Sequence, residues 1–253
     1  MKKHESLIYG LLAASLFCAA APALSLKQQQ LRHGHVQAAY REKEAGAKKL
    51  FADKGVAYPP QRLLLRVLKR ERLVELWASG RRADKLALIT AYNICASSGG
   101  LGPKRQRGDG QVPEGFYHIN HFNPESSFYL SLGVSYPNTS DLVLKIGRDP
   151  GGAIYIHGNC VTIGCMPLTD DKIKELYVIA LDATAGGLDK IPVHIFPAKL
   201  DSAGFSALNA EFGANKALLE FWTNLKQGYD RFELEHIVPK VSISAKGKYL
   251  FPR

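Results

Sequence analysis

The sequence has 253 residues, of which 46% are hydrophobic, and a formal net charge of +10 at pH 7. This length and apolar content allow one domain of good size, or one domain with a small second lobe. Repeats and low-complexity tracts do not occur, and only the N-terminal end carries a long apolar run. These features exclude repeat architectures and proteins with several membrane spans.

The first 25 residues have the layout of a secretory signal peptide. A short basic start, MKKHES, precedes the apolar stretch LIYGLLAASLFCAAAPAL, and small residues suit cleavage near Ala23 or Ser25. A membrane anchor is the alternative, but Pro22 interrupts the apolar run, which is barely long enough to span a bilayer. Lipidation of Cys18 is disfavoured because the bulky Phe17 precedes it. We therefore expect an exported, periplasmic protein with no integral membrane segment after cleavage.

Export changes how the charge and the cysteines are interpreted. Loss of residues 1–25 removes two lysines and one glutamate, which leaves a net charge of +9. In an exported protein such a charge suits an anionic envelope polymer or a solvated surface, and we expect no nucleic-acid partner. The three remaining cysteines are an odd number, so an oxidising compartment leaves at least one thiol free unless it pairs between molecules.

The first half of the mature chain predicts helices, then strands, then a long loop. Residues 27–54 are polar with scattered apolar positions and indicate one or two amphipathic helices, which end before the prolines of GVAYPPQR. Residues 62–77 alternate apolar and basic side chains around an Arg/Lys/Glu corner and favour a β-hairpin, with a helix as the alternative. Residues 85–95 predict a further strand, and the glycine-rich residues 96–115 a long loop.

The second half predicts short strands, a helix and a helical end. The segments FYHINHF, SFYLSLGVSY, DLVLKIG and AIYIHG are apolar runs between turn residues, which is typical of strands. Residues 168–187 have a helical pattern that Thr169 caps and Gly186 ends. IPVHIFPAKL indicates another strand, residues 206–235 one or two closing helices, and VSISAKGKYLF a terminal strand or tail.

These elements predict an α+β protein that is mainly β, a β-sandwich or barrel with helices at both ends of the chain. We expect four parts. A signal peptide covers residues 1–25 and an N-terminal helical segment covers 26–61. The central domain covers 62–200, and a C-terminal helical extension, 201–253, packs on it. A functional site is expected in the long loops near the strand ends.

The stretch IYIHGNCVTIGCMPLTDD places a histidine and two cysteines where a core strand is expected, and three interpretations are open. A zinc site would use His157, Cys160 and Cys165, although no second cluster of ligands completes it. A disulfide between Cys95 and Cys160 is the second interpretation, because ITAYNIC and IYIHGNC both end strands just before loops. That bridge would leave Cys165 free.

Nucleophilic catalysis is the third interpretation. A thiolate needs a base, and histidine is the side chain whose pKa allows this role near neutrality. Gly164 lets the backbone at Cys165 approach a carbonyl closely and lets N–H groups point at a developing oxyanion. Gly158 likewise lets the chain turn beside the imidazole of His157.

The segment HGNCVTIGC, from His157 to Cys165, resembles the active-site motif of the L,D-transpeptidases with the YkuD fold, most closely their periplasmic YafK-like branch. The similarity extends to flanking blocks, including ICASSGGLGPKRQRGDGQVPEGFYHI, FNPESSFYLSLGVSYPN and IPVHIFP, and it covers residues 62–200 well. The chain departs from the wider family in two ways. Ile163 stands where a histidine is common, and the gap between the His-Gly and Gly-Cys elements is short.

The resemblance implies roles for four residues. Cys165 would be the nucleophile that forms a thioester with a peptide carbonyl, and His157 would be the base. The Gly158 carbonyl would hold the imidazole, and N–H groups around Gly164 and Cys165 would bind the oxyanion. The resemblance further implies peptidoglycan stem peptides as substrates, a wall-linked lipoprotein as a further partner, and no metal or organic cofactor.

Four other residues are candidates for substrate contacts. His118 and His121 follow the long loop, Tyr129 belongs to the strand segment SSFYLSL that would shape the cleft, and Lys104 lies in the basic part of the loop. A solvated basic loop is the plainer interpretation of Lys104. His194 fits a core histidine better than a catalytic one.

The sequence therefore predicts an exported cysteine acyl-transfer enzyme, either an L,D-transpeptidase or a hydrolase of the same bond. One rival is a non-catalytic cell-wall binding module of the same fold, with Cys165 locked in a disulfide. The other rival is a zinc peptidase.

Overall fold

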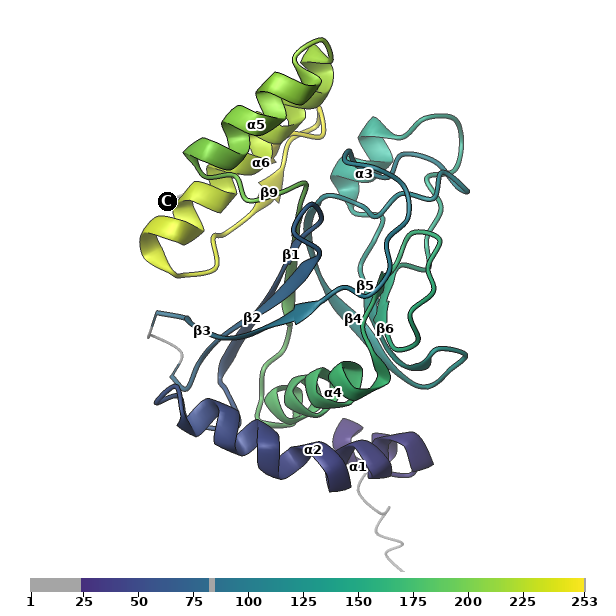
Figure 1. Cartoon of the computed structure of the whole chain (residues 1–253), viewed down its shortest axis with the longest axis vertical. Helices are drawn as coiled ribbons and strands as arrows, with labels where there is room; N and C mark the ends of the chain where they lie inside the picture. Colours follow the sequence, from purple (N-terminus) through teal and green to yellow (C-terminus); the bar gives the residue numbers. More distant parts are fainter. Residues whose placement is uncertain (1–23, 82–84, 253) are drawn as a thin grey trace, which may run out of the picture.

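The computed structural model describes residues 24–81 and 85–252, so all but the last two residues of the predicted signal peptide lie outside the described residues. Within these ranges the chain forms a sheet with helices contributed by both ends of the chain (Figure 1). The α+β class predicted from the sequence, with helices at both ends of the chain, is confirmed, and the described residues form a mixed fold of one large sheet and its helices. None of the helices in the described ranges combines the length and apolar character that a membrane crossing requires.

In the described residues, eight strands form one sheet in the order β3-β2-β1-β8-β4-β5-β6-β7. Their bounds are β1 Arg62–Leu68, β2 Leu73–Ser79, β3 Ala87–Asn93, β4 Gly115–Ser126, β5 Tyr129–Val134, β6 Tyr155–His157, β7 Met166–Pro167 and β8 Pro192–Phe196. The predicted hairpin is present, since β1 and β2 pair antiparallel along their whole length. The pairs β1–β8 and β6–β7 are parallel.

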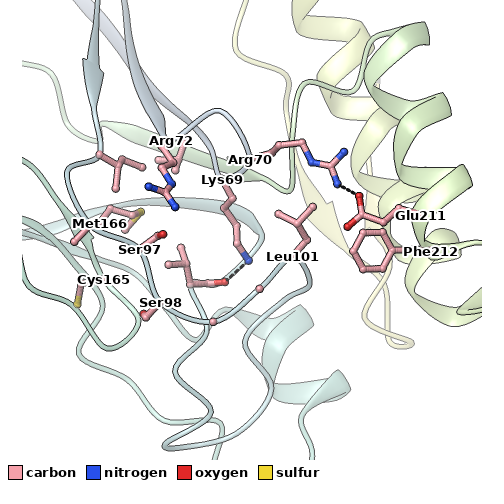
Figure 2. Close-up of a pocket in the computed structure, with 16 residues that line it drawn as sticks. Lys69, Arg70, Arg72, Ser97, Ser98, Leu101, Cys165, Met166, Glu211 and Phe212 are labelled. Carbon is pink, nitrogen blue, oxygen red and sulfur yellow. Dashed lines mark hydrogen bonds and ion pairs between the residues drawn. The ribbon is translucent and has the colours of Figure 1, made fainter.

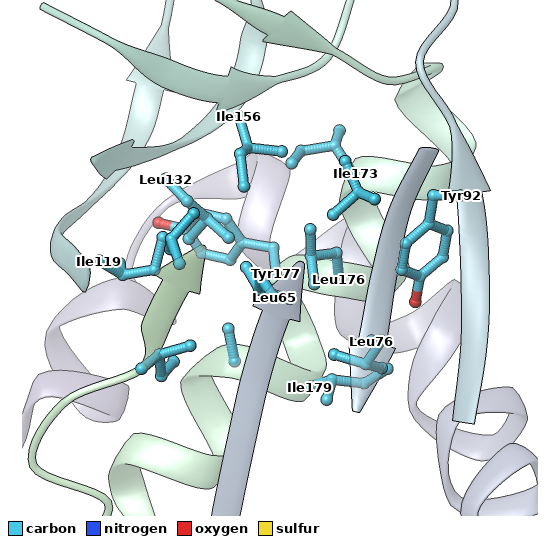
Figure 3. Close-up of a cluster of buried hydrophobic side chains, with 14 of the residues drawn as sticks. Leu65, Leu76, Tyr92, Ile119, Leu132, Ile156, Ile173, Leu176, Tyr177 and Ile179 are labelled. Carbon is cyan, nitrogen blue, oxygen red and sulfur yellow. The ribbon is translucent and has the colours of Figure 1, made fainter. Parts of the chain in front are cut away.

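Strand β4 belongs to both halves of the sheet. Residues 115–118 pair with β8, whereas residues 119–126 pair with β5. The two halves enclose one helix, α4 (Asp170–Ala185). In Figure 3, the α4 side chains lie between side chains of β1–β3 on one side and of β4–β6 on the other. This shared core holds two short strands in place: β6, which ends at His157, and β7, which precedes α4.

The predicted cap residues of α4 have the expected places. Thr169 is the N-cap, and its side chain accepts a hydrogen bond from the backbone N–H of Lys172. Asp170 and Asp171 occupy the first turn, where the helix dipole favours negative charge. Gly186 is the C-cap. The local sequence therefore determines both ends of this helix.

The N-terminal segment folds as two helices, α1 (Leu26–Gln30) and α2 (Gly34–Ala52). They lie under α4 in Figure 1, on the side away from the C-terminal helices. One face of α2 is buried in the main core through Val36, Ala39, Ala47 and Phe51. The amphipathic helices predicted for residues 27–54 are therefore present, and α2 covers one side of the apolar core to which α4 also belongs.

The C-terminal segment forms α5 (Ser202–Phe212) and α6 (Lys216–Glu235), followed by a short ribbon of β9 (Ser242–Ile243) and β10 (Tyr249–Leu250). These elements have an apolar cluster of their own, which includes Trp222 and Leu225 of α6 and continues into the sheet through Phe116 and Phe196. The helical pair therefore packs against the end of the sheet where β1 turns into β2 (Figure 1).

One predicted strand is wrong. The segment DLVLKIG lies largely in a short helix, α3 (Thr139–Leu144). Asn138 caps it, and the Asn138 and Asp141 side chains each accept a hydrogen bond from the other residue's backbone N–H. This capping box is a local start signal that outweighs the apolar run. The helix leaves Leu142 and Val143 about half exposed, at 48% and 46%.

Candidate active site

His157 is held at the end of β6 by its ring nitrogen and by an aromatic neighbour. The side chain is buried, and its Nδ1 lies 2.5 Å from the carbonyl oxygen of Gly158. The ring packs on that of Phe128, with 4.6 Å between the centroids. A carbonyl oxygen only accepts, so Nδ1 must carry the proton, and in the neutral ring Nε2 is left free to accept one.

Cys165 lies immediately before β7, on the chain segment next to His157. Ile156 is the partner of Met166 and His157 the partner of Pro167 in the parallel β6–β7 pair. This register brings Cys165 beside Tyr155, whose backbone N–H interacts with the thiol. In the described part of the chain the Cys165 thiol donates to the Ala153 carbonyl, at 3.6 Å, rather than to His157.

Both members of this pair are neutral at neutral pH. Burial raises the pKa of the Cys165 thiol above its usual value, and the Tyr155 N–H and the charge of Lys104 offset only part of that effect. Burial lowers the pKa of His157, against the opposing effect of its hydrogen bond to Gly158. The resting state is therefore a neutral thiol and a neutral imidazole on neighbouring strands.

Two glycines are required by the geometry of this segment. A Cβ at Gly158 would lie 2.6 Å from Asp170 Oδ1 and 2.8 Å from the carbonyl oxygen of Phe128. Gly164 has φ +132°, which L side chains rarely adopt. A larger residue at Gly158 would displace the preceding His157, and a larger residue at Gly164 would displace the following Cys165.

The N–H groups expected to bind an oxyanion already have a partner. The backbone N–H groups of Gly164 and Cys165 donate to the Thr162 hydroxyl oxygen at 3.2 and 2.8 Å, and that hydroxyl donates to the Cys165 carbonyl at 2.9 Å. The N–H groups do converge on one oxygen, as an oxyanion site demands. In this conformation that oxygen belongs to Thr162.

Cys95 and Cys160 form a disulfide, with 5.4 Å between their Cα atoms. Cys165 is the free cysteine of the described residues. The bridge removes Cys160 from the zinc set considered for this stretch, because a disulfide sulfur is not a thiolate ligand. It also joins the segment that carries the site to the long loop after β3.

A cavity of about 490 Å³ lies beside Cys165. Its walls come from the β1–β2 turn, from loop residues 96–101, from the start of β7 and from the C-terminal end of α5 (Figure 2). The apolar wall is formed mainly by Val67, Ile94, Leu101, Val112, Met166 and Phe212. The charged groups around it are Lys69, Arg70, Arg72 and Glu211.

The residues predicted to contact substrate do not line this cavity. His118 bonds to Ser135 at 3.0 Å, and the His121 ring contacts Tyr155, with 5.4 Å between centroids. Tyr129 packs on His35 of α2, with 4.5 Å between ring centroids. The Lys104 ammonium is buried and donates to Asp109 at 2.6 Å, so its charge already has a partner inside the loop.

Sequence reasoning missed the three cations of the β1–β2 turn that line the cavity, Lys69, Arg70 and Arg72, and also the buried Glu114 that accepts from Lys69. The Glu114 carboxylate is fully buried and accepts from Lys69 Nζ at 2.9 Å and, through its other oxygen, from Trp222 Nε1 at 2.7 Å. The available signal was the cluster KRER at the turn of a predicted hairpin, which was interpreted only as a corner. Only the packed fold shows that this turn faces Cys165.

Comparison with known proteins gives one family. The YkuD family, described as the L,D-transpeptidase catalytic domain, matches residues 62–195. The Escherichia coli strain K12 protein named "Putative L,D-transpeptidase YafK" is 33% identical over 188 residues. That alignment covers 74% of this chain and 72% of YafK.

Solved structures show weak similarity to this chain. Pgp2 of Campylobacter jejuni, a helical cell shape determining protein, is 17% identical with a TM-score of 0.43, over 72% of this chain and 73% of that one. L,D-transpeptidase 1 of Mycobacterium tuberculosis is 16% identical with a TM-score of 0.30, over 53% of this chain and 61% of that one. At these TM-scores the structural similarities add nothing to the assignment, which rests on the sequence matches.

Proposed function

The chain belongs to the YkuD family of L,D-transpeptidase catalytic domains, and on this basis we propose that it cleaves and transfers peptidoglycan stem peptides through a thioester on Cys165. Membership of the family makes the protein a peptidoglycan-related enzyme. The thioester, the choice of bond and the acceptor are proposals that rest on the chemistry of the site.

The hydrogen bond from His157 Nδ1 to the Gly158 carbonyl is the observation that carries this proposal. It leaves Nε2 unprotonated in the neutral ring, which is the form that can take a proton from a thiol. The lowered pKa of His157 keeps the ring in that form at neutral pH. A merely structural histidine would not need a free, basic nitrogen next to a free cysteine.

The first half of the reaction forms the acyl-enzyme. His157 Nε2 takes the proton of the Cys165 thiol while Sγ attacks the carbonyl carbon that follows the L-centre of a diamino acid residue. The carbonyl oxygen becomes an oxyanion and replaces the Thr162 hydroxyl as acceptor for the Gly164 and Cys165 N–H groups, which requires the Thr162 side chain to turn away. Collapse expels the amine, which receives the proton from His157, and leaves a thioester.

The second half transfers the acyl group. His157 removes a proton from an incoming amine or from water, the new bond forms at the carbonyl carbon, and Cys165 leaves and regains its proton. An amine acceptor gives a transpeptidase that crosslinks stems or anchors a protein. Water gives a hydrolase, including one that releases a wall-linked lipoprotein. We also propose that the chain is exported to the periplasm, where this substrate is found.

Mass spectrometry of purified muropeptides, before and after incubation with the enzyme, tests the proposal. We expect cleavage or exchange at the diamino acid, and a covalent adduct on Cys165 after treatment with a carbapenem β-lactam. Cys165→Ala should abolish both, and His157→Ala should reduce turnover by about 100-fold or more.

His33→Ala is the matched control, because this histidine lies between α1 and α2, away from the cavity, and pairs with Glu125. It should leave the rates unchanged. An adduct on another residue, or normal turnover in Cys165→Ala, would assign the nucleophile elsewhere. Wall binding with neither turnover nor adduct would favour the rival, a non-catalytic binding module.

A further inference from the structure

The β1–β2 turn presents three cations to the cavity beside Cys165, and two of them are neutralised. Lys69 Nζ donates to the buried Glu114 carboxylate at 2.9 Å and to the carbonyl oxygens of Gly102 and Val112. Arg70 pairs with Glu211 of α5. Neither group is free to bind a ligand without breaking a contact that holds the cavity wall.

Arg72 differs from both neighbours. Its main chain is used, since its carbonyl oxygen accepts from the Ile94 N–H at 2.8 Å. Among the contacts of residues 24–81 and 85–252, its guanidinium makes neither a hydrogen bond nor an ion pair, and the side chain is exposed. The adjacent Glu71 carboxylate is directed elsewhere, accepting from the Lys199 N–H at 3.0 Å.

The position of Arg72 relates this free charge to the nucleophile. Figure 2 shows its guanidinium close to Ser97 and Met166, at the end of the cavity that Cys165 lines, whereas Arg70, Glu211 and Phe212 line the opposite end. A planar guanidinium binds carboxylates with two parallel hydrogen bonds. The Ser97 hydroxyl stands on the facing loop, and apolar side chains line the space between.

We propose that Arg72 is a specificity-determining residue that binds a free carboxylate of the substrate peptide next to Cys165. The inference rests on the proposed function for the identity of the peptide, but the anion-binding site itself is independent of it. A short aliphatic segment of the peptide would lie on the apolar wall, and the carboxylate would be held by the guanidinium.

The backbone at Arg72 makes a clean variant available. Arg72 has φ +54°, in the left-handed region that favours glycine. Arg72→Gly therefore removes the cation without straining the turn, and its Tm should equal or exceed that of the wild type. Arg72→Lys keeps the charge but loses the planar fork. Arg81→Ala is the control, because it removes one positive charge from the opposite end of β2, roughly 20 Å away.

The first experiment compares two alkylating agents on Cys165, the anion iodoacetate and the neutral iodoacetamide. We expect the ratio of their rates to fall about fivefold or more in Arg72→Gly, partly in Arg72→Lys and not at all in Arg81→Ala. Added salt should lower the ratio in the wild type. An unchanged ratio in Arg72→Gly would overturn the proposal, whatever the enzyme's natural substrate.

The second experiment uses stem tetrapeptides and locates the carboxylate. Two sources are available, the carboxylate on the side chain of the diamino acid and the C-terminal carboxylate of the leaving residue. Arg72→Gly should raise KM about tenfold or more for the peptide with both carboxylates free. Amidation of one of them should abolish the difference between the variant and the wild type, and that peptide identifies the source.

If Arg72→Gly raised KM by the same factor for every peptide, amidated or not, Arg72 would not be recognising a carboxylate. Absence of turnover in the wild type would refute the proposed function but would leave the alkylation result valid. The two proposals therefore fail separately.

Discussion

At the scale of single residues, the site is controlled by burial rather than by charge. Burial raises the pKa of Cys165 and lowers that of His157, and no ion pair between them offsets either change in the described contacts. The pair is therefore unlike a preformed thiolate–imidazolium. The reaction proposed for Cys165 therefore requires the thiol to lose its proton as the sulfur attacks the substrate carbonyl.

The pH dependence of alkylation checks this description. Because the pKa of Cys165 is raised, its reaction with iodoacetamide should still be increasing with pH above the pKa of an ordinary thiol, about 8.5. His157→Ala should shift that profile little. A rate that reaches its plateau below neutral pH would show a thiolate already formed and would contradict the neutral pair.

Turnover should depend on pH at the acid end of the range, where His157 becomes protonated. Since the pKa of His157 is lowered, its neutral, basic form persists below the ordinary histidine pKa of about 6.5. The acid limb of kcat/KM should accordingly lie below pH 6.5, and activity should be lost as the pH falls through the pKa of His157. An acid limb above pH 7 would show that the folded protein raises this pKa.

At the scale of elements, the segment between His157 and Cys165 has no regular structure and is held at three points. The Asn159 N–H donates to Asp170 at 2.8 Å at one end, and Thr162 closes the other end. The Cys95–Cys160 disulfide holds the middle. Ile163 is 90% exposed, so apolar packing does little to fix this segment.

Removal of the disulfide should therefore cost both stability and activity. We expect Cys160→Ser to lower the free energy of unfolding by about 2–4 kcal/mol, measured in urea, and to reduce turnover more than Tm alone would suggest. Protein lacking residues 1–25 should show one titratable thiol without reductant and three after reduction. The Cys95→Ser/Cys160→Ser double variant should be insensitive to reductant. Three titratable thiols in oxidised protein would exclude the bridge.

At the scale of the whole molecule, buried carboxylates attach the terminal helices to the sheet domain. Asp182 of α4 accepts three hydrogen bonds of 2.6 Å, from Lys27 Nζ in α1, from the Tyr40 hydroxyl in α2 and from the Tyr58 hydroxyl. Glu114 attaches the C-terminal helices in a similar way, because it accepts a hydrogen bond from Trp222 Nε1 of α6. Each carboxylate joins segments far apart in the sequence.

Asp182→Asn tests the N-terminal attachment. The asparagine amide has the shape of the carboxylate but lacks its charge. Its NH2 group is a donor, so it cannot accept a hydrogen bond from the Lys27 or tyrosine donor that it would face. We expect a loss of about 1–3 kcal/mol in the free energy of unfolding. Asp171→Asn is the control on the same helix, because its exposed pair with Lys43 should contribute less than about 1 kcal/mol. Equal losses in both variants would contradict the role of Asp182.

The sequence by itself determined most of the elements and supplied the two residues proposed as the reactive pair. Periodicity predicted the amphipathic N-terminal helices and the β1–β2 hairpin, and Thr169 and Gly186 predicted the ends of α4, because these signals act over a few residues. His157 and Cys165 were proposed from a short motif, His157 to Cys165, which resembles the active-site motif of the family. The strand predicted for DLVLKIG was wrong because the capping box of Asn138 and Asp141 starts a helix there, despite an apolar run of strand-like length.

Only the tertiary structure decided what surrounds the pair. Arg72, Ser97 and Cys165 come from three separate segments, and they line one cavity because β1 pairs with β8 and the C-terminal helices pack behind the β1–β2 turn. The disulfide partner of Cys160 lies 65 residues away in the sequence. Lys104 and Arg72 look alike in the sequence, and the fold buries one beside Asp109 and leaves the other free. Long-range packing sets which charge is neutralised, and no local pattern records it.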